Sequence, residues 1–300
     1  LTEPQPIYRH STLYVVYVYD IASKQLRLLD PAKVLHASFS PDAQKVAFVK
    51  ENNLYIKDLP TDQVQTVTND GLKNKIINGN CDWVYEEEFS FTQAYQWSPK
   101  GNFIAYYKFD ESQVKEYTMF FDEGKEYPTE YRYKYPKAGE DNSIVSIHIF
   151  DLNSKNNTTA DIGPEKDQYI PRIKWTNKDN ELAVTRLNRH QNHLELLLVT
   201  ANSGNSQVIY EEKNKYYVDI TDNLTFLPDN QSFVITSEQD GYNHLYRWNW
   251  IKKEMTQLTR GVNEVKDVLG VQTRNGQIFY TITEDVLNTA FYVIDIKKGI

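Results

Sequence analysis

Short hydrophobic runs alternate with polar turns along most of this chain, and the stretch from Val34 to Val67 shows the pattern most clearly. Hydrophobic, β-branched and aromatic residues gather at positions 35–39, 45–49, 53–58 and 63–67. The sequence Ser40-Pro41-Asp42 separates the first two runs, and Pro and Asp favour a turn at that point. Runs of this length between turn residues predict four short strands.

The same unit recurs farther along the chain. Turn sequences begin at Trp97, Trp175, Leu227 and Thr273, and a predicted strand follows each of them, at positions 103–107, 182–185, 233–236 and 278–281. A period of about 45 to 50 residues with four strands per repeat is typical of a β-propeller blade. One such sheet cannot bury both of its faces alone, so neighbouring blades must stack. We therefore predict an all-β propeller, with about six blades of four antiparallel strands in this chain.

Two stretches interrupt this rhythm. The first, from Gly71 to Phe91, carries a cluster of acidic residues. The second, from Glu111 to Glu140, is rich in aromatic residues that alternate with charges: Tyr117, Phe120, Phe121, Tyr127, Tyr131, Tyr133 and Tyr135. Because so aromatic an insertion is costly to leave in water, it predicts a protruding hairpin that docks on another subunit or domain. The alternative is an arm folded back on its own blade.

Composition narrows the possible partners. The 300 residues carry a net charge of −8, from 33 Lys and Arg against 41 Asp and Glu, with no dense basic block. Nucleic acid is therefore not an expected partner. The chain also lacks any apolar run near the roughly 20 residues that a membrane span needs. Its one cysteine, Cys81, allows no internal disulfide and no cysteine-based metal site.

The acidic cluster is the most informative segment. Its sequence is Asp82-Trp83-Val84-Tyr85-Glu86-Glu87-Glu88-Phe89. Three unpaired acids repel one another, so their place among aromatic residues predicts a bound cation. Glu87 and Glu88 can address one ligand only where the backbone is helical, which separates them by about 100°. We therefore expect a short helix at 85–89, and a solvated acidic turn is the alternative.

Beyond this motif, three further segments point to a known family. They are Trp97-Ser98-Pro99-Lys100-Gly101-Asn102-Phe103, Tyr135-Pro136-Lys137-Ala138-Gly139 and Asp240-Gly241-Tyr242-Asn243-His244. With the acidic motif and with Tyr8-Arg9-His10-Ser11, they resemble the β-propeller of the dipeptidyl peptidase IV family over essentially the whole chain. The resemblance points to a bacterial member.

The resemblance implies a specific function. Members release N-terminal dipeptides after Pro or Ala, and the two glutamates that bind the substrate amine match Glu87 and Glu88. Arg9 matches the arginine that contacts the peptide carbonyl beside the scissile bond. The acids then act as a ruler, which places the second peptide bond at the catalytic serine. No cofactor or metal is implied, and the expected partners are peptides with a free N-terminus.

The family's catalytic serine lies in a Gly-x-Ser-x-Gly elbow of an α/β-hydrolase domain, and no such elbow occurs in this chain. We therefore assign no catalytic residue and expect an internal piece of the enzyme: residues 1–300 would be part of an eight-bladed propeller, and the hydrolase domain would lie outside them. The aromatic arm around Tyr117 to Tyr135 predicts a homodimer formed through it. The resemblance implies a periplasmic, cell-surface or secreted location.

Two alternatives stay open. The chain could be a non-catalytic propeller that serves as a binding or dimerisation scaffold through its arm, or the enzyme could be a related tripeptidyl or acylaminoacyl peptidase. His190 and His193 have a spacing that suits a metal on a helix, but they fall at a predicted hairpin tip with no third ligand nearby in the sequence. We therefore expect no metal there. The other histidines lie in or beside predicted strands, where hydrogen-bonded or core roles are expected.

Overall fold

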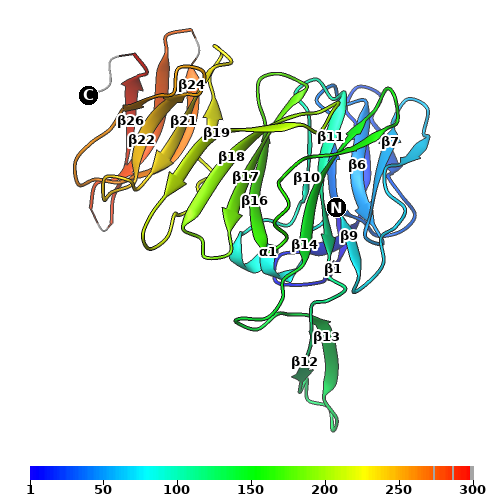
Figure 1. Ribbon diagram of the computed structural model, residues 1–300. Helices are drawn as coiled ribbons and strands as arrows, with labels where there is room; N and C mark the ends of the chain where they lie inside the picture. The colour runs from blue at the N-terminus through cyan, green and yellow to red at the C-terminus, as the bar shows by residue number, and fades with distance from the viewer. Residues whose placement is uncertain (273, 286, 298–300) are drawn as a thin grey trace. The chain divides into compact units, whose positions relative to one another are not determined.

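The structure is a computed structural model, and it describes residues 1–272, 274–285 and 287–297 (Figure 1). The chain forms two compact units, one comprising Leu1–Pro171 and Val199–Ser206 and the other Arg172–Leu198 and Gln207–Ile300. Strands dominate both units, which confirms the all-β prediction. Among the described residues, no helix has the length and apolar character required to span a bilayer.

The first unit opens with two small antiparallel pairs and then a four-stranded sheet. The pairs are β1 (Thr2–Pro6) with β2 (Thr12–Val15), and β3 (Tyr17–Asp20) with β4 (Gln25–Leu28). The sheet runs in the order β5 (Leu35–Phe39), β6 (Lys45–Lys50), β7 (Asn53–Asp58) and β8 (Val64–Thr66). These four strands match the four hydrophobic runs of the sequence, so the predicted blade unit is confirmed there.

Strand β6 shows why one sheet needs neighbours on both sides. Successive side chains of a strand point to opposite faces. Val46 and Phe48 belong to one buried apolar cluster, and Ala47 and Val49 belong to another. The second cluster also contains Ile104, so the sheet shares its core with the next sheet along the chain.

That next sheet carries the functional segment. It consists of β9 (Ile76–Asn78), β10 (Tyr95–Trp97), β11 (Phe103–Asp110), β14 (Ile144–Asp151) and β15 (Asn157–Thr159). Both β9 and β10 pair with β11, β9 at residues 108–110 and β10 at residues 104–106. The chain therefore leaves this sheet after β9 and returns at β10. The excursion between them holds α1 (Trp83–Glu88), the helix of the acidic motif.

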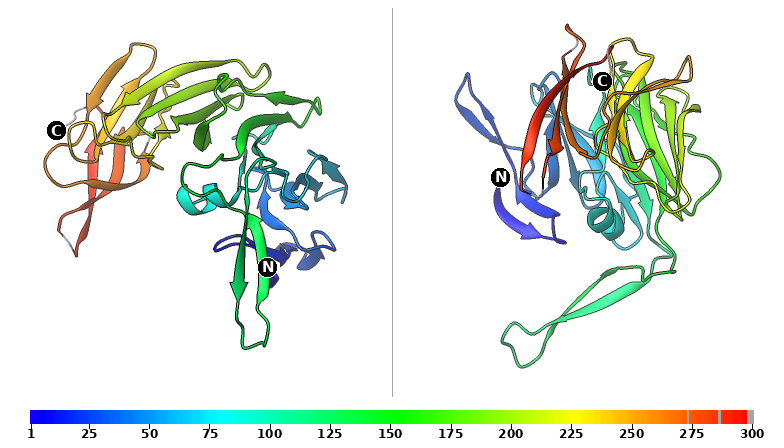
Figure 2. Two further views of the ribbon diagram at one scale, coloured as in Figure 1. Left: turned by 60° about the horizontal axis from the view of Figure 1, so that its bottom comes forward. Right: turned by 90° about the vertical axis from the view of Figure 1, so that its left-hand side faces the viewer.

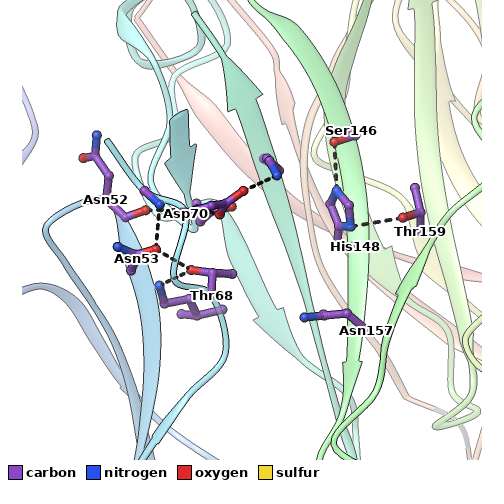
Figure 3. A network of polar contacts seen from close by, with 12 residues as sticks. Asn52, Asn53, Thr68, Asp70, Ser146, His148, Asn157 and Thr159 are labelled. Atoms are coloured by element: carbon purple, nitrogen blue, oxygen red, sulfur yellow. Dashed lines mark hydrogen bonds and ion pairs between the residues drawn. The ribbon is translucent and has the colours of Figure 1, made fainter. Parts of the chain in front are cut away.

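A polar network joins these two sheets (Figure 3). Asp70, just after β8, forms an ion pair with Lys108 of β11, and Asn157 of β15 donates from Nδ2 to the carbonyl oxygen of Val67 at 3.3 Å. His148 of β14 lies between the hydroxyls of Ser146 and Thr159, at 2.9 and 3.2 Å. Burial, assisted by the nearby charge of Lys108, lowers the pKa of His148 to about 4. The imidazole is therefore neutral at pH 7, which suits its half-buried, hydrogen-bonded position.

The aromatic arm is the hairpin of β12 (Glu116–Phe121) and β13 (Thr129–Lys134), which are antiparallel and in register from Glu116 opposite Lys134 to Phe121 opposite Thr129. Figure 2 shows it extending away from the sheet that contains β11 and β14. The predicted hairpin is confirmed.

Farther along, β16 (Gln168–Trp175), β17 (Glu181–Asn188), β18 (His193–Thr200) and β19 (Ser206–Lys213) form one four-stranded sheet in that order. In the second unit, β20 (Thr225–Phe226), β21 (Ser232–Ser237), β22 (His244–Asn249) and β23 (Glu254–Gln257) form another. The last described sheet has three strands, β24 (Val265–Gln272), β25 (Gln277–Thr283) and β26 (Thr289–Asp295). A single cluster that includes Val234, Leu245 and Ile278 fills the space between the last two sheets.

The predicted strands at 103–107, 182–185, 233–236 and 278–281 all lie within longer strands, β11, β17, β21 and β25. The prediction that a turn begins at Thr273 falls partly outside the described residues, which exclude that position. Gly276 lies in the described part of the turn and has φ of 67°, a left-handed conformation that glycine adopts without strain.

Candidate functional site

The site is built on α1, whose start is fixed by Asp82. One carboxylate oxygen of Asp82 accepts from the backbone N–H of Tyr85 at 2.9 Å, and the other accepts from the hydroxyl of Ser143 at 2.6 Å. An aspartate at this N-cap position satisfies a backbone donor that the first helical turn leaves free. The helix therefore runs from Trp83 to Glu88 and not from 85 to 89 as predicted, and Phe89 is its C-cap.

Tyr85 anchors the helix to the core. Its ring is almost completely buried and packs against Phe89 and Phe109, each with a centroid distance of 4.9 Å. Its hydroxyl accepts from the backbone N–H of Ile170 at 2.9 Å. Because both the ring and the hydroxyl are fixed, the helix has one rotational setting, and the three glutamates that follow point in set directions about 100° apart.

Glu86, the first of the three, points inward and is only 1% exposed. One of its oxygens accepts from the backbone N–H groups of His10 and Ser11 at 2.6 and 3.0 Å, and the other accepts from the Ser11 hydroxyl. The carboxylate thus holds the segment that precedes β2. Sequence reasoning assigned no role to this residue.

Glu87, the second, meets Arg9. The Arg9 Nε lies 3.0 Å from each oxygen of the Glu87 carboxylate. The Arg9 side chain is 70% exposed and that of Glu87 is 18% exposed. Both line a cavity of about 600 Å³ whose wall also includes Trp83, Tyr131 and Met119. The structure therefore brings together two of the three predicted site residues across 78 positions of sequence.

Glu88, the third, is exposed at the end of the helix. Among the described residues it has no hydrogen-bond or ion-pair partner, and it does not line the cavity that Arg9 and Glu87 share. Its negative charge lies at the C-terminus of a helix with no basic residue in the last turn. The helix dipole disfavours an anion at that end and favours a cation beside it.

The base of the arm covers this region with aromatic rings. Trp83 packs against Tyr135 with a centroid distance of 4.0 Å, and Tyr8 packs against Tyr133 at 5.6 Å. The Tyr131 hydroxyl donates to the carbonyl oxygen of Ile7. The half of the arm nearest the sheet is therefore folded onto its own unit, as the alternative interpretation of the sequence proposed. The outer half is open, since Phe120 and Tyr127 are 62% and 81% exposed.

The histidine pair of the sequence separates in the structure. His190 is exposed in the turn between β17 and β18, whereas ligand atoms of His193, Glu195 and Glu211 lie within 4.8 Å of one another. Sequence spacing could not show these two carboxylates. Each is already neutralised by a cation, Glu195 by Arg186 and Glu211 by Lys213. The cluster is therefore an ion-pair network, and a metal would have to displace two cations.

All of residues 1–300 match the family described as the dipeptidyl peptidase IV N-terminal region. The chain belongs to this family. Its structure is similar to the crystal structure of dipeptidyl peptidase 4 from Porphyromonas gingivalis, with a TM-score of 0.92 and 39% identity over 100% of this chain and 43% of that chain.

This dipeptidyl peptidase IV propeller region is also similar in sequence to two mammalian proteins. Dipeptidyl peptidase 4 of Felis catus is 32% identical over 302 residues, and that of Sus scrofa is 29% identical over 302 residues. Each alignment covers 93% of this chain and 39% of the relative. The chain thus spans about two fifths of the length of these proteins, in the region that forms their propeller. The predicted family and propeller class are confirmed, and the number of blades stays a prediction.

Proposed function

We propose that this chain is the part of a dipeptidyl peptidase IV-like serine peptidase that recognises the N-terminus of a peptide substrate. The peptidase releases dipeptides with Pro or Ala at the second position, and a Ser-Asp-His hydrolase domain outside residues 1–300 performs acyl transfer. The observation that carries this proposal is the ion pair of Arg9 and Glu87, which lines an aromatic cavity. The next residue, Glu88, is an acid with no counter-charge among the described residues.

Charge balance supports an ammonium ligand. Arg9 compensates the Glu87 carboxylate, whereas the Glu88 carboxylate has no cation among the described residues. A substrate ammonium placed between the two acids would bring two carboxylates against one guanidinium and one ammonium, so the loaded site is neutral. Charge-assisted hydrogen bonds of this kind are about twice as strong as neutral ones. Arg9, which is mostly exposed, keeps donors free for a peptide carbonyl.

Capture of the amine would fix the substrate along its length. With the α-ammonium held at the helix, the chain can extend by only a set distance before its second peptide bond reaches the nucleophile. Because the scissile bond and the nucleophile are then held in position, their reaction becomes effectively unimolecular. Exopeptidase action then follows from the site, because an internal segment of a polypeptide has no ammonium to present.

A substrate panel tests this proposal on the full-length protein. We expect kcat/KM for a Gly-Pro chromogenic substrate to fall about 100-fold or more when its N-terminus is acetylated, because the carboxylates lose their charged partner. A tripeptide substrate with a free amine serves as the matched control for length. Equal cleavage of free and acetylated dipeptides contradicts the ruler, and faster release of tripeptides or acyl-amino acids assigns the enzyme to a tripeptidyl or acylaminoacyl class.

The open half of the arm favours a second role. We propose that it docks on a second copy of this protein, since Phe120, Phe121 and Tyr127 leave aromatic surface exposed on a hairpin that extends from the sheet. Aromatic anchors of this kind dominate protein interfaces. This contact serves a catalytic dimer and a non-catalytic scaffold equally well.

Sedimentation velocity tests the arm. We expect Phe120→Glu combined with Tyr127→Glu to convert dimers into monomers, with an increase in the dissociation constant of about 30-fold or more. The matched control is Ile21→Glu, which places a charge on a side chain that is 84% exposed in a different turn of the same unit. An unchanged dimer in the arm variant, or equal weakening in the control, would remove the arm as the interface.

A further inference from the structure

A second cavity of about 570 Å³ lies in the first unit and shares part of its wall with the cavity of Arg9 and Glu87. The two cavities share Ile7, Tyr8, Tyr131 and Tyr133, but neither Arg9 nor Glu87 lines the second one. Its wall is largely apolar and aromatic, with Leu13, Leu35 and Ile77 among its residues. The proposed recognition of the substrate amine makes no use of this space.

One acid of this wall, Glu111, is buried, and its side chain has no hydrogen-bond or ion-pair partner in the described part of the chain. It directly follows β11, where its backbone N–H donates to the carbonyl oxygen of Lys75 at 2.8 Å. The residue is 3% exposed, and its Oε2 atom has no hydrogen-bond partner among the described residues. A buried carboxylate oxygen in this state costs free energy comparable to a lost hydrogen bond or more. Burial raises the pKa of Glu111 to about 7, and the nearby charge of Asp82 adds to the effect.

No cation forms an ion pair with Glu111 in the described part of the chain, and the charge of Lys134 offsets the rise of the Glu111 pKa only in part. The Lys134 ammonium donates to the carbonyl oxygen of Val114 at 2.6 Å, and Arg132 pairs with Glu130 at 2.7 Å. Lys73 also lines the cavity but forms no ion pair with Glu111 in the described part of the chain. The charged and titratable groups that face Glu111 or line its cavity are Tyr8, Glu51, Lys73, Cys81, Asp82, Asp110, Glu116, Tyr131, Arg132, Tyr133 and Lys134.

We propose that this cavity binds a primary alkylammonium group, with Glu111 as its counter-ion and the rings of Tyr8, Tyr131 and Tyr133 around it. Tyrosine faces attract cations within about 6 Å of the ring centroid. A carboxylate without a hydrogen-bond partner among the described residues suits an ammonium donor, since a charge-assisted hydrogen bond between the two is about twice as strong as a neutral one. A divalent metal is disfavoured, because Ca²⁺ and Mg²⁺ require about six oxygen ligands and this wall offers few.

The proposal predicts a proton exchange that purely apolar binding lacks. Below pH 7 Glu111 holds a proton in the empty cavity, and an ammonium binds best to the ionised carboxylate. Binding therefore releases the proton, and affinity falls as the pH drops through 7. Without a ligand, stability depends on pH in the opposite direction to affinity. The pKa of Glu111 is about 7 in the folded state and about 4.5 in the unfolded state, so the free energy of unfolding falls as the pH rises between these two values.

Isothermal titration of the full-length protein with n-butylammonium tests the site. We expect Glu111→Gln to weaken binding about 10-fold or more, and to abolish proton release measured at pH 6.5 in two buffers of different ionisation enthalpy. Glu51→Gln is the matched control, because Glu51 is an exposed acid on the wall of the same cavity, and its affinity should stay within twofold of wild type. The thermal midpoint at pH 8 without ligand should be higher for Glu111→Gln than for wild type, which shows that the variant folds.

Three results would overturn the proposal: n-butanol binding as tightly as n-butylammonium, unchanged affinity in Glu111→Gln, or no proton release. Glu88→Gln separates this site from the proposed recognition of the substrate amine. Any change that it causes in n-butylammonium affinity reports binding at the helix α1, and the result is independent of that for Glu111→Gln. Nα-acetyl-lysine amide and Gly-Pro present the ammonium on a side chain or on a chain terminus. The one that Glu111→Gln weakens identifies the source of the group.

Discussion

Replacement of Glu88 by Gln in the full-length protein should lower kcat/KM for a free dipeptidyl substrate about 100-fold, and Glu87→Gln should lower it by a similar factor. Glutamine keeps the shape of the side chain but removes the charge that the substrate ammonium meets. A hydrogen bond to a charged group contributes about 1.5 to 3 kcal/mol, and about 1.4 kcal/mol corresponds to a factor of ten in rate. In Glu87→Gln, Arg9 also loses its counter-charge, but water screens that loss because the Arg9 side chain is 70% exposed.

The two variants differ in a second measurement. Glu88 has no hydrogen-bond or ion-pair partner among the described residues, and its charge opposes the helix dipole, so Glu88→Gln should leave the thermal midpoint unchanged or raise it slightly. Glu87→Gln removes the ion pair with Arg9 and should lower the thermal midpoint slightly. Glu126→Gln is the matched control, since Glu126 is an exposed acid on the arm away from the helix. Near wild-type kcat/KM in both Glu87→Gln and Glu88→Gln would falsify the role assigned to the acid pair.

The repeating sheets could be predicted well, because a strand bounded by turn residues is determined largely by the residues of that segment itself. The sequence also located the helix to within two residues, and the N-cap rule applied to Asp82 would have placed its start correctly. What it could not supply was the partner of each glutamate. Three consecutive acids on a helix point in directions that span about 200°, so they cannot share one role. Which one faces the core depends on Tyr85, whose hydroxyl meets Ile170 across 85 residues of sequence.

Glu111 illustrates a second limit. Its sequence neighbours Asp110 and Ser112 mark the end of a strand, and nothing local distinguishes it from an exposed turn acid. The cavity that it lines is formed by the arm, the segment around Tyr8 and the strand β9, which come from three different parts of the chain. Arg9 is the opposite case, because the family resemblance, and no local pattern, indicated that it belongs to the substrate site.

Glu86 has the largest expected effect on the fold of the site. We expect Glu86→Ala to lower the free energy of unfolding by about 3 to 5 kcal/mol, since three donors of His10 and Ser11 lose a buried carboxylate at once. The thermal midpoint should fall by about 10 °C. Calorimetry or circular dichroism on heating measures it. Glu86→Gln should cost about one third as much, because its amide oxygen still accepts from both backbone N–H groups and its NH₂ can donate to the Ser11 hydroxyl.

The same variants show whether Glu86 positions Arg9. The segment that carries Arg9 is tied to the helix through Glu86, so its release should raise KM for dipeptidyl substrates about 10-fold at a temperature where Glu86→Ala is still folded. Ser11→Ala removes only the hydroxyl contact and is the matched control, with a loss near 1 kcal/mol and a nearly unchanged KM. If Glu86→Ala loses stability but keeps the wild-type KM, then Glu86 supports the fold alone, and the Arg9–Glu87 ion pair is sufficient to hold the arginine in place.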